Sequence, residues 1–164
     1  MLTAQEVVRA NAPDQTTPVF DTITLPHDER HLRRKRLVME SGEALMVDLP
    51  QTVHLGHGDL LLVTDDKAVA VRAAIEPLTE IHAKDPTHHA ALCWHIGNRH
   101  LKAQIEPDRI LILRDPVIHT MLEGLGAHLH LVDEPFHPVH GAYHSHYDHG
   151  HGHAHSHEQE HSHG

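Results

Sequence analysis

The chain has 164 residues, of which 39% are hydrophobic and 23 are histidine, and its formal net charge is -10 when the histidines are counted as neutral. This length allows one domain of ordinary size or two small ones, and the negative charge argues against nonspecific nucleic-acid binding by the whole molecule. A single cysteine, Cys93, excludes an intrachain disulfide framework and cysteine-rich zinc modules. Because Met1–Pro13 lacks a secretory signal and no stretch approaches the roughly eighteen apolar residues of a membrane span, we expect a cytoplasmic protein with no membrane partner.

Residues 1–75 are predicted to form an all-β domain. Short runs of β-forming residues between turns predict strands at Val19–Leu25, Arg36–Met39, Ala44–Leu49, Leu60–Val63 and Val69–Arg72. The Ser41–Gly42 segment supplies one turn, and Asp65–Lys67 supplies another that lets the last two strands pair. Only Ala4–Ala10 has a helical pattern in this part of the chain.

A histidine-containing segment precedes the strand predicted at Arg36–Met39. The spacing in His27–His31 resembles the zinc-protease motif HExxH, but Glu29 is one place too late and the basic run Arg33–Arg36 repels a cation. We therefore predict that His27–His31 is a solvated turn. The basic run is interpreted as the exposed end of a strand, with a docking face for an acidic partner protein as the alternative.

Residues 76–143 are predicted to form a second domain that mixes strands and helices. The predicted order is strand, helix, hairpin of two strands, helix and strand, at Leu78–Ala83, Thr87–Ile96, Lys102–Ile105, Arg109–Leu113, Val117–Leu125 and His128–Val132. Asp85 and Asp115, each followed by proline, are helix start signals, and Gly97 and Gly126 mark the helix ends. The βαββαβ order is typical of the ferredoxin-like fold, so the expected fold class is α+β.

Residues 144–164 contain almost nothing apolar with which to form a core, and they are predicted to be a disordered tail. Nine histidines are spread through this tail: His144, His146, His149, His151, His153, His155, His157, His161 and His163. Neutral imidazole near pH 7 is a good ligand for Ni, Cu, Zn and Co, so we predict a tail that binds divalent metal without selecting among these ions. A pH-sensing or solubilising tail is the main alternative, and the interleaved Gly, Ser, Ala, Tyr, Asp and Glu residues disfavour a purification tag.

Several short motifs occur together in an order typical of one protein family. They are His95–His100 (HIGNRH), Gln104–Ile105, Asp115–Leu122 (DPVIHTML), Pro135–Pro138 (PFHP) and Gly141–Tyr143 (GAY), followed by the His-rich end. With these motifs the chain resembles the UreE family of urease accessory proteins, the nickel metallochaperones. Arg33–Arg36 and Gly58–Leu61 fit the amino-terminal part of that family less specifically. The resemblance extends over most of the chain.

The resemblance implies a non-enzymatic protein that binds Ni(II) and delivers it for assembly of the urease nickel site. It implies a homodimer in which His100 meets its symmetry mate, since a two-fold axis brings two copies of one ligand together. It also implies, as partners, the accessory GTPase and the urease apoprotein of the maturation complex, and an amino-terminal domain similar to the peptide-binding domain of Hsp40-type chaperones. Because the chain has no P-loop motif, any GTP-driven step belongs to a partner. Zn(II) and Cu(II) are expected to compete in vitro.

Other interpretations of individual histidines stay open at this point. His100 follows a predicted helix end, where a histidine can simply favour the helix dipole. Some family members have a His-x-His pair where this chain has Arg114–Pro116, so that auxiliary site is not expected here. His119, inside the second helix, can partly substitute for it.

The last predicted strand carries two further histidines. His128 and His130 alternate along it and therefore share a face, which we interpret as a solvent-facing edge, with weak chelation as the alternative. Leu129 and Leu131 are then expected to face the core. Cys93, in an apolar stretch of the first helix, is expected to be a packed thiol rather than a ligand or nucleophile.

Two other functions compete with nickel delivery. One is a general store or buffer for divalent metal such as zinc or nickel, which would have high capacity without transfer to a client. The other is a metal-dependent hydrolase, which the sequence disfavours because it lacks an ordered three-ligand set with a neighbouring carboxylate base.

Overall fold

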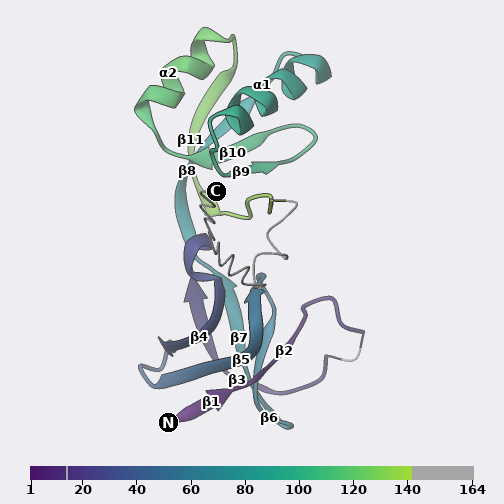
Figure 1. Cartoon of the computed structure of the whole chain (residues 1–164), viewed down its shortest axis with the longest axis vertical. Coiled ribbons are helices and arrows are strands. Elements are labelled where there is room, and N and C mark those ends of the chain that lie inside the picture. The colour runs from purple at the N-terminus through teal and green to yellow at the C-terminus, as the bar shows by residue number, and fades with distance from the viewer. Residues whose placement is uncertain (14, 142–164) are drawn as a thin grey trace, which may run out of the picture.

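A computed structural model of the chain describes residues 1–13 and 15–141. Within them the chain forms eleven strands and two α-helices, arranged as an elongated molecule with a β-rich amino-terminal domain at one end and an α+β carboxy-terminal domain at the other (Figure 1). Strand β8 (Ile75–His82) leads from the first domain into the second. The predicted α+β fold class is confirmed. The disorder predicted for residues 144–164 lies outside the described residues.

The amino-terminal domain consists of two sheets. Its strands are β1 (Leu2–Ala4), β2 (Glu6–Val8), β3 (Val19–Leu25), β4 (His31–Val38), β5 (Ala44–His54), β6 (Leu60–Thr64) and β7 (Lys67–Ala73). One sheet has the order β1-β5-β4, and the other has the order β2-β6-β7-β3. The strands predicted in this part are present, and β6 and β7 pair antiparallel as expected. β4 and β5 extend beyond the predicted segments because they pair with each other along most of their length.

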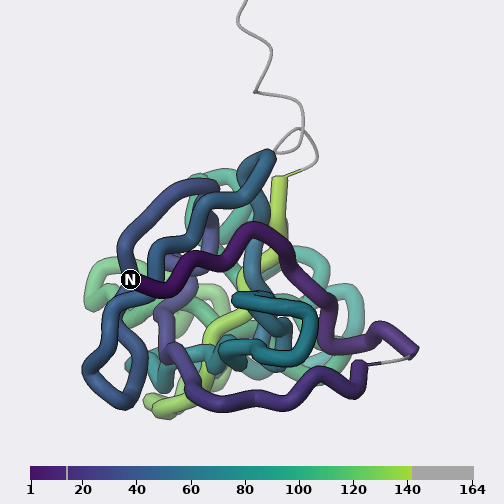
Figure 2. Tube along the Cα trace, turned by 90° about the horizontal axis from the view of Figure 1, so that it is seen from below, coloured from purple at the N-terminus to yellow at the C-terminus, as the bar shows by residue number. Residues whose placement is uncertain are grey.

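The helix predicted at Ala4–Ala10 is wrong. The first residues instead form β1 and β2, which belong to different sheets and run across the end of the molecule (Figure 2). β1 lies parallel to β5, with Leu2 opposite Leu45. A helix of about seven residues is marginal on its own, whereas pairing with β5 and β6 supplies backbone hydrogen bonds and buries Ala4 completely.

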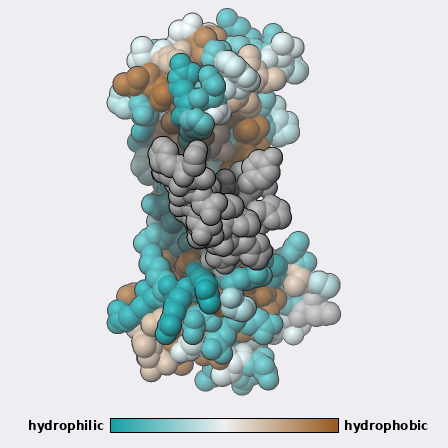
Figure 3. Space-filling model, in the orientation of Figure 1, coloured by the Kyte–Doolittle hydropathy of each residue, from teal (hydrophilic) through white to brown (hydrophobic). Residues whose placement is uncertain are grey.

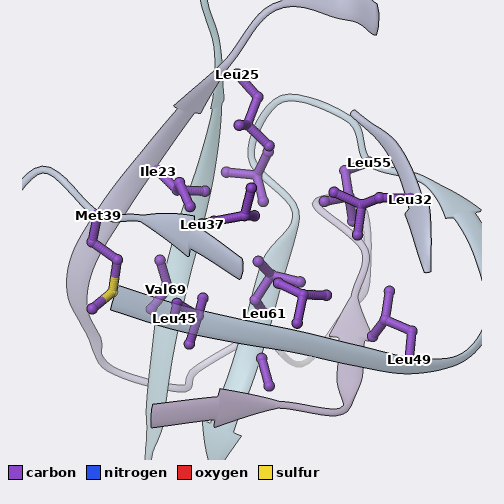
Figure 4. Close-up of a cluster of buried hydrophobic side chains, with 13 residues drawn as sticks. Ile23, Leu25, Leu32, Leu37, Met39, Leu45, Leu49, Leu55, Leu61 and Val69 are labelled. Atoms are coloured by element: carbon purple, nitrogen blue, oxygen red, sulfur yellow. The ribbon is translucent and has the colours of Figure 1, made fainter. Parts of the chain in front are cut away.

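An aliphatic core fills the space between the two sheets (Figure 4). Along β5, Leu45, Val47 and Leu49 are buried and the residues between them are less so, as expected for a strand with one face on the core. Ile23 and Val69 face them from the other sheet. The core therefore depends on branched aliphatic side chains, in keeping with an aromatic content of 3%.

The carboxy-terminal domain has the predicted βαββαβ order. Its elements are β8, α1 (Pro86–Asn98), β9 (Ala103–Ile105), β10 (Ile110–Leu113), α2 (Pro116–Gly124) and β11 (His128–Pro135). The strand order β11-β8-β10-β9, with every neighbouring pair antiparallel, is that of a ferredoxin-like sheet. Both helix starts are confirmed, because Asp85 accepts a hydrogen bond from the His88 N–H at 2.7 Å and Asp115 accepts one from the Val117 N–H at 2.9 Å. Among the described residues, neither α-helix combines the length and apolar character that a membrane span requires.

The two helices pack on one face of this sheet. Leu92 and Ile96 of α1 and Leu122 of α2 are buried with Ile81 and Ile110 of the strands. Cys93 packs beside them, and burial raises the pKa of its thiol, so the expected packed thiol is confirmed.

Surface leucine and valine residues remain at the edge of the helical layer. Leu129 packs against the core as expected, but Leu131 is 61% exposed, so the prediction that it faces the core is wrong. It borders an open pocket beside Pro116 and His119, where the short helix α2 does not cover the sheet. Val117 is 77% exposed on α2, and apolar surface is visible over this part of the domain (Figure 3).

The segment His27–His31 is not the solvated turn that the sequence predicts. It contains a short 3-10 helix, η1 (His27–Glu29), and its exposed fractions are 8% at His27 and 0% at Arg30. Glu76, at the start of β8, accepts a hydrogen bond from the His27 N–H at 3.0 Å, and its second oxygen lies 2.7 Å from His27 Nδ1. This partner is 49 positions away in the sequence, so the local pattern carries no sign of it.

Arg30 joins the two domains through its buried guanidinium. It donates one hydrogen bond to the carbonyl oxygen of Leu25, at the end of β3, and another to that of Phe136, just after β11. Phe136 is itself fully buried, and its ring meets the His27 ring edge to face at 5.0 Å. Burial lowers the pKa of Arg30, and the nearby carboxylates of Glu76 and Asp28 oppose that shift. The guanidinium is therefore part of the structure that holds the domains together.

Candidate metal site

His100 follows the C-cap residue of helix α1, Arg99, and has an unusual backbone conformation. Its φ is +57°, in the left-handed region, and it is the only non-glycine residue with a positive φ in the part of the chain that the structure describes. The His100 N–H donates to the Gly97 carbonyl at 3.0 Å, and the Leu101 N–H donates to the Ile96 carbonyl at 3.4 Å. Together these two bonds form a Schellman motif, in which glycine usually takes the left-handed position. Helix α1 thus continues past Gly97 to Asn98, and His100 takes the left-handed position of the motif that follows it.

A side chain at this position has an energetic cost. The left-handed conformation brings Cβ close to the following carbonyl oxygen, at about 1 kcal/mol for a residue other than glycine. The helix dipole accounts for a cation near a helix end, but it does not require a residue with this backbone conformation. Strained residues cluster at functional sites, so this conformation indicates a functional role for the His100 side chain.

The surroundings of His100 are partly apolar and partly charged. The exposed imidazole borders a pocket of about 310 Å³. The residues around it include the apolar Leu101, Leu113 and Ile118 and the charged Lys102, Arg114 and Asp115. Within residues 1–13 and 15–141, no group of three or more His, Cys, Asp or Glu side chains is arranged to hold one metal ion. In the described part of one chain, His100 is therefore not a complete metal site.

The other histidines considered as metal ligands are distributed over the carboxy-terminal domain. His119 lies 2.8 Å from the carboxylate of Glu123, one helical turn further along α2. His128 and His130 are exposed on β11, as expected for a solvent-facing edge, and the His130 ring lies 5.9 Å from that of His82. The nine tail histidines between His144 and His163 lie outside the described residues.

A second group of histidines, which the sequence did not single out, lies between the two domains. His31 and His54 are directly opposite each other on β4 and β5, and their ring centres are 6.4 Å apart. His140 reaches the same place from the segment after β11, with its ring centre 4.1 Å from that of His54. No local motif marks these residues. Only the strand register and the path of the chain after β11 bring them together.

The environment of His54 keeps its imidazole neutral. Burial lowers the pKa of His54 to about 4, and the nearby side chains of His140 and Arg30 add to the shift. At pH 7 the ring therefore has a free nitrogen lone pair.

Two family models match nearly the whole chain. The model described as UreE urease accessory protein, N-terminal domain, matches residues 4–74, and the model of the C-terminal domain of the same family matches residues 76–163. The chain belongs to the UreE family. The resemblance stated from the sequence motifs is therefore confirmed.

Individual relatives agree with this assignment. The chain is 58% identical over 127 residues to the urease accessory protein UreE of Agrobacterium fabrum, covering 77% of this chain and 79% of the relative. It is 50% identical over 139 residues to UreE of Rhizobium meliloti, covering 85% and 90%. It is 51% identical over 149 residues to UreE of Brucella anthropi, covering 89% and 87%. As a member of the UreE family, the chain is a urease accessory protein and not an enzyme.

The lowered pKa of His54 predicts a pH dependence of stability in this UreE-family protein. Between about pH 4 and pH 6.5 the unfolded chain binds a proton at His54 that the folded chain does not, so the free energy of unfolding rises with pH across this window. The contribution is complete above pH 6.5 and is lost as the pH falls toward 4. Because the ring is partly exposed and solvent screens it, we expect His54 to contribute about 1 kcal/mol to the difference in the free energy of unfolding.

Urea denaturation in the presence of a chelator tests this prediction. Stability is compared at pH 4.5 and pH 7 for the parent chain, for His54→Gln and for His128→Gln, whose side chain is exposed on β11. The difference between the two pH values should shrink in His54→Gln and persist in His128→Gln. Equal differences in all three proteins would contradict the assignment.

Proposed function

We propose that this protein binds Ni(II) at His100 and delivers it to the urease maturation complex, as a cytoplasmic homodimer. The observation that carries the proposal is the histidine in a left-handed, glycine-type position at the exposed end of α1. Near a two-fold axis, one such histidine from each chain supplies two ligands. Two imidazoles hold an ion loosely enough to release it, which suits a protein that must transfer its metal.

The rest of the chain has separate roles in this proposal. The tail histidines collect metal, and the domain of residues 76–143 presents the bound ion at the dimer interface. Leu113, which is 39% exposed beside the His100 pocket, supplies apolar surface for contact with a second copy. The domain of residues 1–75 docks protein partners, among them the accessory GTPase and the urease apoprotein. Zn(II) and Cu(II) compete for the same imidazoles in vitro.

Urease activity in cells that lack this gene tests the proposal. At limiting nickel we expect low urease activity, because the apoenzyme is not loaded, and added nickel should restore it. The intact gene should restore activity at limiting nickel, whereas His100→Ala should not. A gene lacking codons 144–164 should fail to restore activity at limiting nickel. It should restore activity at an intermediate nickel supply.

His128→Ala is the matched control, since it also removes one exposed histidine of the carboxy-terminal domain. It should complement as well as the intact gene. A simple storage protein predicts a different result, in which deletion changes the metal content of the cells but leaves urease activity at limiting nickel unchanged. That result, or full complementation by His100→Ala, would contradict nickel delivery through His100.

A further inference from the structure

Strand β4 carries a concentrated positive charge on the surface of the amino-terminal domain. Its four consecutive basic residues are all exposed: Arg33, Arg34, Lys35 and Arg36. The whole chain has only 13 Lys and Arg residues and a formal net charge of -10. A protein that is acidic as a whole therefore presents one strongly basic strand to solvent.

Carboxylates of the chain neutralise this strand only in part. Arg34 lies 3.8 Å from Asp48, and the side chains of both are exposed. Lys35 lies 3.4 Å from Glu29 in a similarly exposed pair. In the part of the chain that the structure describes, the other two arginines form no ion pair with a carboxylate. Because exposed pairs of this kind contribute little, the strand keeps most of its positive charge available to a partner.

β4 also lies at the edge of its sheet. The strand order β1-β5-β4 leaves one side of β4 without a paired strand among the described residues. In an antiparallel pair, alternate residues of each strand direct their N–H and C=O groups away from the partner strand. β4 therefore offers backbone hydrogen-bonding groups to a further extended segment, which can add to the sheet as a new strand.

The register of β4 with β5 shows which side chains such a segment would meet. Leu37 lies opposite Leu45, and both side chains are buried in the core. Because side chains alternate along a strand, Arg34, Arg36 and Val38 share the opposite, outer face, with about 6.6 Å between successive members. Val38 is 59% exposed. The outer face of β4 thus presents two cations followed by an apolar side chain.

We propose that the edge of β4 is a docking surface for an extended acidic segment of a partner protein, with carboxylates against Arg34 and Arg36 and an apolar side chain against Val38. Alternate residues of the added strand have the same spacing as those of β4, so one segment can meet all three side chains at once. Opposite charges steer the encounter, and backbone hydrogen bonds hold the segment in place. Only the assignment of this segment to a partner in urease maturation rests on the proposed function.

Protection of the edge against nonspecific strand pairing is a competing explanation for the charges. Charged side chains and irregular pairing discourage the addition of strands, and the register of β4 with β5 shifts between Leu32 and Arg34. Protection does not account for Val38, because an exposed apolar side chain on an edge strand favours pairing. It also predicts that acidic and basic peptides bind equally poorly.

Peptide binding to the full-length protein tests the docking surface. The probe is a fluorescein-labelled peptide, Thr-Glu-Thr-Glu-Thr-Val-Thr, and binding is followed by fluorescence anisotropy. The buffer has low salt, pH 8 and a chelator, so the imidazoles are neutral and no metal is bound. A peptide with lysine in place of both glutamates should bind at least about tenfold more weakly. A peptide of the same composition with adjacent glutamates should bind about threefold more weakly, because only one carboxylate then faces an arginine.

Variants of the protein locate the binding. The double substitution Arg34→Gln and Arg36→Gln should weaken binding of the alternating acidic peptide by about tenfold or more. The matched control, Lys67→Gln with Arg99→Gln, removes two exposed cations outside β4 and should stay within about twofold of the parent. Val38→Thr should weaken binding by about threefold, because it removes apolar contact area. Far-UV circular dichroism checks that each variant is folded.

Three results would overturn the proposal. The first is an equal loss of affinity in the two double variants, and the second is equal binding of the alternating and adjacent acidic peptides. The third is displacement of the probe by a single-stranded oligothymidylate of equal charge as effectively as by unlabelled acidic peptide, which would indicate a general polyanion surface. His100→Ala should bind the peptide like the parent, because the assay contains no metal. Failure of peptide docking is therefore distinguishable from failure of nickel delivery.

Discussion

Replacement of Arg30 by alanine is expected to lower the free energy of unfolding by about 3 kcal/mol or more. The side chain is fully buried, and it donates hydrogen bonds to backbone carbonyls at the ends of both domains, in Leu25 and Phe136. Its removal leaves both carbonyl oxygens without their donor and the buried carboxylate of Glu76 without a nearby cation, and it opens a cavity in the buried region between the domains. Urea denaturation of the metal-free protein, followed by circular dichroism, measures the loss.

Arg36→Ala provides the matched control for Arg30. Arg36 is exposed on β4, so its truncation should change stability by less than about 0.5 kcal/mol. Arg30→Met, which keeps much of the side-chain volume but none of the donors, should lie between the two because it avoids the cavity and still leaves the carbonyls unpaired. Equal stabilities of Arg30→Ala and Arg36→Ala would show that the interdomain hydrogen bonds contribute nothing.

His100→Gly is expected to make the protein more stable and a poorer nickel binder at the same time. Glycine adopts the left-handed conformation of residue 100 without the Cβ strain, which should raise the free energy of unfolding by about 1 kcal/mol. In the proposed homodimer, loss of the imidazole from both chains should weaken nickel binding at the proposed site by more than about tenfold. Thermal unfolding and nickel titration calorimetry of a chain ending at residue 143 measure the two effects separately.

Two further substitutions at residue 100 distinguish the backbone from the side chain. His100→Asn should bind nickel as weakly as His100→Gly but should have nearly the parent stability, because asparagine tolerates the left-handed region. His100→Ala should lose nickel affinity and gain no stability. If His100→Gly kept the parent's nickel affinity, another residue would hold the metal. If it lowered stability, the histidine would be making a contact that outweighs the strain.

Local signals in the sequence were sufficient to predict most of the helices and strands of the carboxy-terminal domain. Asp85 and Asp115, each followed by proline, start helices as predicted because N-capping depends on residues only two or three positions away. The hairpin of β9 and β10 likewise depends on one short turn. The HIGNRH motif singled out His100 as a candidate ligand, which stays a prediction, and its left-handed conformation was not expected.

Contacts between residues far apart in the sequence determined the parts of the fold that were not predicted. The first residues form β1 and β2 instead of a helix because β5 and β6 provide partners far along the chain, and tertiary pairing outweighs the weak helical preference of a short segment. The local sequence of Arg30 predicts a solvated side chain. The side chain is buried instead, and one of its hydrogen-bond partners is 106 positions away.

The sequence by itself therefore determined the family, the order of the elements in the carboxy-terminal domain and the choice of His100 as the candidate ligand. Each of these follows from short motifs, hydrophobic periodicity and helix caps, whose interactions span a few residues. Only the tertiary structure decided that Arg30 and His27 are buried and that His31, His54 and His140 meet. Burial and ring contacts depend on how two domains pack, and packing is a property of the whole chain that no local window contains.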